Sequence, residues 1–144
     1  MIMFNKKSNN MKIDNLVSVA DRHIGASYPS DFKCVSFVRM LYSEVGLSID
    51  FYNQPVITSL DDLFVPENIG KIIFLMRKNC NAYLYSHVAI VYDNESVVHY
   101  SRHLNIDGIR RVEISSFTDL LSVYDLVPNP YSPLINKKVK TPYL

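Results

Sequence analysis

The fold and the chemistry of this chain centre on residues 31–42, Asp31-Phe32-Lys33-Cys34-Val35-Ser36-Phe37-Val38-Arg39-Met40-Leu41-Tyr42. The apolar residues recur every three or four positions, which predicts an amphipathic helix, and Gly46 follows as a stop signal. The stripe expected to be buried consists of Phe37, Val38, Leu41, Tyr42 and Val45. Cys34 lies on the same stripe, so we expect its thiol to face whatever the helix packs against.

Cys34 also falls on the first turn of this helix, after Ser30 or Asp31 as candidate N-caps. Unpaired backbone N–H groups and the positive end of the helix dipole favour a thiolate at such a position. The alternative is a small buried apolar residue, which is the commoner role of an isolated intracellular cysteine. Residues 31–42 alone do not distinguish between a nucleophilic and a packing role for Cys34, so the distinction depends on residues later in the chain.

The composition indicates one domain, residues 1–144, with a core over about 12–128 and an irregular, proline-containing tail over 129–144. The 15 basic and 14 acidic residues leave a formal net charge of +1, which gives no electrostatic case for a nucleic acid or a membrane partner. No apolar run is long enough to span a bilayer, and residues 1–10 turn polar too early for a secretory signal peptide. We therefore expect a protein that is cytoplasmic as synthesised and that would need a specialised secretion system for export.

The periodicity of the chain changes from helical to extended along its length. Residues 14–24 predict a first helix ended by Gly25, and a shorter helix over 59–64 would have Ser59 and Asp62 as a capping box. Later runs are short, rich in β-branched and aromatic residues, and separated by turn residues. The expected strands are 71–76, 85–92, 97–101, 109–114 and 123–127, with a helical turn or two at 115–121. Helices followed by an antiparallel meander indicate an α+β fold.

Two of the expected strands carry histidines. His87 begins one strand and His99 lies on the next, and the short connection over 93–96 predicts a β-hairpin. Strand alternation would place both histidines on one face, together with Ala89, Val91, Val97 and Ser101. Two histidines on a packed face, with an inward cysteine at a helix start, make a set of nucleophile, base and orienting group.

The chemistry expected of this set is acyl transfer. Cys34 is the nucleophile, His87 takes its proton or pairs with it as an ion, and His99 holds the His87 ring in one tautomer. The Cys34 backbone N–H and the Tyr28 hydroxyl would face the developing oxyanion. This chemistry needs no metal and no cofactor. A zinc site made of the cysteine and the two histidines is the alternative by ligand type, but no close Cys/His pair anchors it.

The order and spacing of these residues resemble the NlpC/P60 superfamily of papain-like cysteine peptidases. The resemblance rests on the cysteine helix, on the run Ser86-His87-Val88-Ala89-Ile90-Val91-Tyr92 and on the twelve-residue step from His87 to His99. Phe37-Val38 and Gly70-Lys71-Ile72-Ile73-Phe74 are similar to two further landmarks of the family. The resemblance spans residues 16–127. It implies an unpermuted Cys–His–His site on a papain-like fold, with N-terminal helices packed on an antiparallel sheet of about five or six strands.

The resemblance also implies a reaction and a substrate class. The reaction is hydrolysis of an amide bond in a small peptide through an acyl group on Cys34, and the default substrate is a peptidoglycan-type peptide or fragment. Several family residues are replaced here, by Lys33, Val35-Ser36, Lys71 and Ser86. Because these replacements reshape the cleft walls, an amidase or acyltransferase acting on a biosynthetic intermediate or a host protein, as a bacterial effector does, stays open. A binding module that kept the fold without turnover is the remaining alternative, and a protein inhibitor is a further candidate partner.

Three other residues have suitable chemistry but weaker placement. His103 is four residues after His99 and is the fallback for the orienting group. His23 lies in the first helix and is expected at the surface. Cys80 lies in a loop and is expected to be a bystander, and we expect two free thiols rather than one disulfide.

Overall fold

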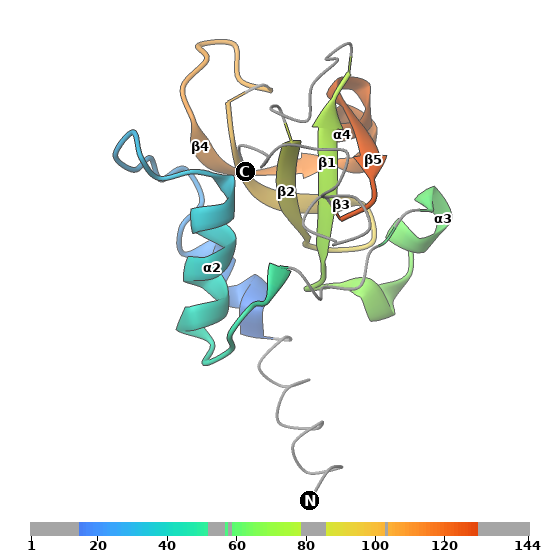
Figure 1. Cartoon of the computed structure of the whole chain (residues 1–144), viewed down its shortest axis with the longest axis horizontal. Coiled ribbons are helices and arrows are strands. Elements are labelled where there is room, and N and C mark those ends of the chain that lie inside the picture. The colour runs from blue at the N-terminus through green and yellow to red at the C-terminus, as the bar shows by residue number, and fades with distance from the viewer. Residues whose placement is uncertain (1–14, 52–56, 58, 79–85, 103, 130–144) are drawn as a thin grey trace, which may run out of the picture.

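The computed structural model describes residues 15–51, 57, 59–78, 86–102 and 104–129, and it has an α+β fold (Figure 1). Within these residues, the strands are β1 Ile72–Arg77, β2 Ser86–Val91, β3 Ser96–Ser101, β4 Arg111–Ser116 and β5 Tyr124–Val127. The helical elements are residues 15–21, α2 Cys34–Glu44, α3 Leu60–Leu63, the 3-10 helix η2 Pro66–Asn68 and α4 Phe117–Val123. The predicted α+β class is confirmed, and each predicted strand is present with its ends within two residues of the prediction.

The strands form one antiparallel sheet with the order β4-β3-β2-β1-β5. Strands β1, β2 and β3 each pair with the next strand in the sequence, whereas β5 returns to the opposite edge and pairs with β1. In these pairs, Leu75 lies opposite His87 and His99 lies opposite Glu113. Strand β2 is therefore in the middle of the sheet, with β1 on one side and β3 on the other.

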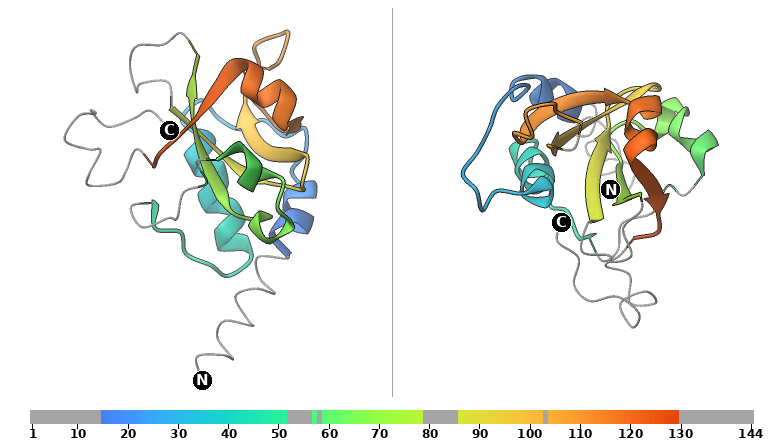
Figure 2. Two further views of the ribbon diagram at one scale, coloured as in Figure 1. Left: turned by 90° about the vertical axis from the view of Figure 1, so that its right-hand side faces the viewer. Right: turned by 90° about the horizontal axis from the view of Figure 1, so that it is seen from above.

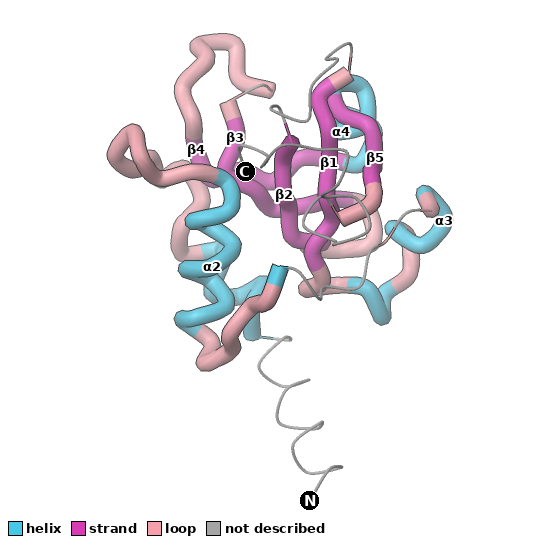
Figure 3. Tube along the Cα trace, in the orientation of Figure 1, coloured by secondary structure: helices cyan, strands magenta, loops and turns pink. Residues whose placement is uncertain are grey.

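Each face of the sheet buries its own apolar cluster, because side chains alternate along every strand. On one face, α2 packs against the strands through Phe37, Leu41, Phe74, Val88, Ile90 and Val98. On the other face, α4 and β5 pack against them through Leu75, Ala89, Val91, Val97, Phe117, Leu120 and Tyr124. Figures 2 and 3 show α2 and α4 on opposite sides of the strands. Burial of each large apolar side chain stabilises the fold by roughly 1.5–3 kcal/mol, which explains why the strands are apolar on both faces.

The start of α2 is where predicted, but its cap is not. The helix begins at Cys34, and its N-cap is Lys33 rather than Ser30 or Asp31. The two predicted caps belong instead to a turn over residues 29–32, which is closed by a backbone hydrogen bond of 2.9 Å. The turn uses these residues before the helix begins, so neither can cap it.

Two predicted glycine stops are confirmed by their backbone geometry. Gly25 and Gly46 have φ values of 87° and 78°, a left-handed conformation that glycine adopts at little steric cost. The first helix is shorter than predicted, since residues after 21 form a turn. Ser59 is the N-cap of α3 but makes no side-chain cap hydrogen bond, so the predicted capping box is wrong.

No helix in the described part of the chain is long and apolar enough to cross a membrane. Cys80, His103 and residues 130–144 of the predicted tail lie outside the described residues. Asn129, the first residue of that tail, is buried, and its side chain donates a hydrogen bond to the carbonyl oxygen of Phe51.

Candidate active site

The two histidines of the β2–β3 hairpin lie side by side on the α4 face of the sheet. His87 Nε2 and His99 Nδ1 are 2.8 Å apart, which is hydrogen-bond distance. The exposed fraction is 6% for His87 and 0% for His99, so water has almost no access to the pair. The structure therefore brings together two of the predicted site residues in direct contact.

His99 has a further hydrogen-bond partner on the neighbouring strand. Its Nε2 lies 2.9 Å from the Ser115 hydroxyl oxygen on β4. Burial lowers the pKa of His99 to about 3, so its ring is neutral over the ordinary pH range. A neutral imidazole has one N–H donor and one acceptor nitrogen, so hydrogen bonds at both nitrogens hold the ring in place.

The ring of Tyr124 on β5 stacks on His87, with the ring centroids 5.0 Å apart and the planes at 14°. Burial raises the pKa of Tyr124 to about 12, although a hydrogen bond with the Ser101 side chain acts in the opposite direction. Sequence reasoning missed Tyr124, because only the pairing of β5 with β1 brings this residue to His87.

Cys34 is a buried free thiol at the first residue of α2. The backbone N–H of Val88 donates a hydrogen bond to its sulfur, so the sulfur lies against the peptide unit that joins His87 to Val88. Cys34 packs in the apolar cluster on the α2 face, whereas the His87 ring stacks on Tyr124 on the α4 face. The Cys34 sulfur therefore lies near the N-terminal end of β2 on the α2 face of the sheet, whereas the histidine pair lies on the α4 face.

Burial has the largest influence on the Cys34 thiol and raises its pKa. Hydrogen bonds from the backbone of Val88 and Val35 and the positive charge of Arg110 act in the opposite direction. The helix start thus favours the thiolate, as predicted, but burial outweighs it. We infer that the resting thiol is neutral, so a nucleophilic role requires a base.

The predicted oxyanion donor Tyr28 is engaged elsewhere. Its hydroxyl lies 3.0 Å from His23 Nδ1, and His23 Nε2 lies 3.0 Å from a Glu44 carboxylate oxygen. Cys34 begins and Glu44 ends α2, an 11-residue helix that is about 15 Å long. The structure therefore directs the Tyr28 hydroxyl toward the far end of the helix. His23, which was predicted at the surface in the first helix, lies in the turn after that helix, is partly exposed, and links Tyr28 to α2.

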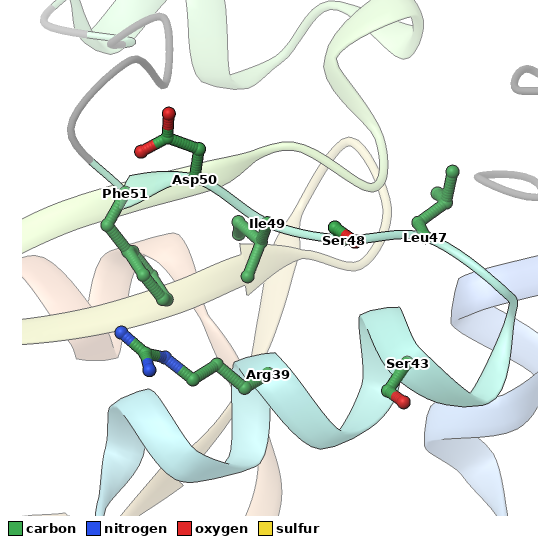
Figure 4. Close-up of a pocket in the computed structure, with 7 residues that line it drawn as sticks. All are labelled: Arg39, Ser43, Leu47, Ser48, Ile49, Asp50 and Phe51. Carbon is green, nitrogen blue, oxygen red and sulfur yellow. The ribbon is translucent and has the colours of Figure 1, made fainter.

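A cavity of about 390 Å³ lies beside α2 (Figure 4). Its lining residues come from α2 and the segment after it, and they are Arg39, Ser43, Leu47, Ser48, Ile49, Asp50 and Phe51. The Arg39 guanidinium carbon is 5.0 Å from the centroid of the Phe51 ring. Arg39 is five residues after Cys34, about 8 Å farther along the helix axis. The cavity is thus on the helix that carries the thiol, but it does not include the thiol.

The described residues include no group of three or more His, Cys, Asp or Glu side chains arranged to hold a metal ion. Comparison with known proteins gave no match to a family model, to a curated protein or to a solved structure. The function therefore has to be argued from the geometry of the site and from the motifs of the sequence.

Proposed function

We propose that the protein is a cysteine hydrolase of the papain-like NlpC/P60 type, with Cys34, His87 and His99 as catalytic residues. The observation that carries the proposal is the 2.8 Å hydrogen bond between His87 Nε2 and His99 Nδ1, next to the peptide N–H that binds the Cys34 sulfur. A nucleophile beside a histidine that a third group orients is used for acyl transfer on several unrelated folds. The sequence motifs around Cys34 and His87 support the same reaction.

In the proposed reaction, His87 is the general base for a neutral thiol. Its Nε2 is engaged by His99, so the thiol proton goes to Nδ1. The electron pair of the sulfur forms a bond to the amide carbonyl carbon, and the carbonyl π-electrons move to the oxygen. The proposed donor to this oxyanion is the Cys34 backbone N–H at the start of α2. Tyr28 can take part only after its hydroxyl leaves His23.

The tetrahedral intermediate then breaks at the C–N bond. The amine leaves with the proton held on His87 Nδ1, and the acyl group stays on the Cys34 sulfur as a thioester. Water that gives its proton to His87 attacks the thioester, which releases the carboxylic acid, and the proton returns to the thiol. His99 stays neutral throughout, since burial keeps its pKa at about 3, and it holds the His87 ring in orientation.

The proposed substrate is a small peptide, by default a peptidoglycan-type peptide. The cavity beside α2 supports a peptide that carries both charges, because the Arg39 guanidinium can bind a carboxylate with two hydrogen bonds and the Asp50 carboxylate can bind an ammonium group. Lys33 and Lys71 replace residues that are typical of the family, and these replacements are compatible with an amidase or acyltransferase that acts on another substrate. Adding an amine or alcohol as acceptor distinguishes transfer from hydrolysis.

The test uses a Cys80→Ser background, so that Cys34 is the only thiol in the chain. The protein is incubated with a panel of peptidoglycan fragments and peptides, and mass spectrometry detects the products and any acyl group on Cys34. We expect cleavage and a trapped thioester with Cys34 present and neither product with Cys34→Ala. Equal cleavage by the two proteins would contradict the proposal.

A binding module without turnover is the second candidate, and one observation favours it. Only 7% of Cys34 is exposed, and burial raises the pKa of its thiol. Iodoacetamide separates the two candidates, because it reacts with an activated thiol at neutral pH and spares a buried structural one. In the Cys80→Ser background, rapid alkylation that disappears with His87→Gln supports the hydrolase, and no alkylation supports the binding module.

A further inference from the structure

Glu113 on β4 lies behind the histidine pair. It is directly opposite His99 in the β3–β4 register, and its Oε1 is 3.7 Å from His99 Nε2. This oxygen is buried and accepts no hydrogen bond from the residues that the structure describes. Ser115, two residues farther along the same strand, contacts the same His99 nitrogen at 2.9 Å. A carboxylate and a hydroxyl therefore both face Nε2 of a neutral imidazole.

The position of one proton on His99 determines what His87 can do. If the proton is on His99 Nε2, then Nδ1 accepts a hydrogen bond from His87 Nε2–H, and His87 Nδ1 carries a lone pair. If the proton is on His99 Nδ1, this N–H donates to His87 Nε2, and the proton of His87 must be on Nδ1. Only the first arrangement leaves His87 Nδ1 able to take a proton from Cys34.

We propose that Glu113, together with Ser115, is a positioning residue that holds the proton of His99 on Nε2 and thereby makes His87 Nδ1 a base. The negative charge at 3.7 Å stabilises an N–H at Nε2, and the Ser115 hydroxyl accepts the hydrogen bond from it. The proposed relay thus runs from Glu113 and Ser115 through His99 and His87 to Cys34. Its effect on reactivity rests on the proposed function, whereas its effect on the tautomers does not.

The relay also gives the buried pair a connection to solvent. The Glu113 side chain is 20% exposed, while that of His99 is fully buried. The groups that face Glu113 are His99 on β3, Tyr124 on β5, the Asn105 side chain, and Arg111 with its partner Asp107. Burial raises the pKa of Glu113, Asn105 and Arg111 lower it, and Asp107 raises it. As the pH falls, protonation of Glu113 removes the charge that favours an N–H at His99 Nε2, so reactivity should decline on this acid limb.

The test compares Glu113→Gln with Glu67→Gln, a control that removes the same charge at an exposed position. Imidazole ¹⁵N NMR spectra report which nitrogen of each histidine carries the proton. In the parent protein we expect the proton on Nε2 of both His87 and His99. Glutamine can present an N–H to His99 Nε2, so Glu113→Gln should move both protons to Nδ1, and Glu67→Gln should leave both in place.

The reactivity of Cys34 gives a second measurement, made with iodoacetamide in the Cys80→Ser background. General-base assistance is worth about 10²–10⁴-fold, so Glu113→Gln should slow alkylation by roughly 10-fold or more and remove the acid limb. Ser115→Ala is the second variant, and it should lower the fraction of His99 and His87 that carry the proton on Nε2. It also provides a test if Glu113→Gln does not fold.

Unchanged tautomers in both folded variants would overturn the inference. The outcomes for the two proposals are distinguishable. If Cys34→Ala cleaves the substrate panel as well as the parent does, the proposed hydrolase is wrong, and the NMR spectra still decide whether Glu113 sets the tautomers.

Discussion

In the described part of the structure, two chains of hydrogen bonds are centred on histidine, and they differ mainly in their surroundings. One chain joins Tyr28, His23 and Glu44 at distances of 3.0 Å between neighbours, with side-chain exposures of 22% for His23 and 36% for Glu44. The other joins His87, His99 and Ser115 at 2.8 Å and 2.9 Å, and the central His99 is fully buried. Each chain joins a histidine to a hydroxyl group, and the second chain includes His87, whose neighbour Val88 donates its backbone N–H to the Cys34 sulfur.

The burial of a histidine, and not its hydrogen-bond partners alone, determines whether its ring can become charged and what role it can have. The exposed chain has a carboxylate that solvent screens, so it mainly fastens the segment after the first helix to the end of α2. The buried chain keeps His99 neutral, so its hydrogen bonds orient the rings without introducing a charge. Orientation at constant charge is what a general base needs from the group behind it.

The largest expected difference between the two chains is in catalysis. His87→Gln should lower turnover of a cleaved peptide by about 10²–10⁴-fold, because the general base is lost. His23→Gln should leave turnover within about twofold, because its ring contacts Tyr28 and Glu44 rather than the thiol. Steady-state rates on the same peptide, with circular dichroism to verify folding, check both variants. Similar losses of turnover in the two variants would contradict the expectation that the His87 chain, and not the His23 chain, acts in catalysis.

The second difference is in the pH dependence of stability. Burial lowers the pKa of His99 from 6.5 to about 3, so the unfolded chain binds a proton that the folded chain excludes. The stability from this group is present above about pH 6.5 and is lost as the pH falls toward about 3. Between pH 7 and pH 5 it amounts to a loss of about 2 kcal/mol in the free energy of unfolding.

Urea unfolding at these two pH values measures this loss. His99→Gln should remove about 2 kcal/mol of the pH dependence, whereas His23→Gln should retain it. A pH dependence that is the same in the parent and in His99→Gln would show that His99 is not the group responsible.

The smallest effect concerns Tyr28, for which sequence and structure lead to different expectations. A role in the oxyanion hole predicts a loss of about 10²–10³-fold in kcat for Tyr28→Phe. The hydrogen bond to His23 predicts a loss of about 1 kcal/mol in the free energy of unfolding and no change in kcat. We expect the second result, measured by urea unfolding and steady-state kinetics. A kcat loss without a stability loss would instead support the oxyanion role.

The α+β class, the strands and the hairpin could be predicted because they depend on local patterns. The three-and-four spacing after Cys34 marks one buried stripe, and the short turn between His87 and His99 leaves little choice of pairing. The contact between the two histidines then follows from strand alternation. Their catalytic roles and those of Cys34 and Tyr28 stay predictions until the experiments above are done.

The residues around the histidines could not be predicted in the same way. Ser115 and Glu113 reach His99 through the β3–β4 register, and Tyr124 reaches His87 only because β5 crosses to β1. A serine, a glutamate or a tyrosine on a short strand has no sequence signal of such a contact. The position of Cys34 at a helix start could be predicted from nearby residues. Its burial could not, because the sheet that covers the thiol is formed by residues much later in the chain.

The crossing of β5 to the far edge of the sheet has a consequence for the timing of assembly. Tyr124, whose ring covers one side of His87, belongs to the last strand of the described chain. On a ribosome, Cys34 and both histidines emerge before this strand is made, and during that time His87 lacks the ring that packs on it. The surroundings of His87 are therefore completed only after β5 has been synthesised, so a chain truncated before Tyr124 would leave His87 without this ring.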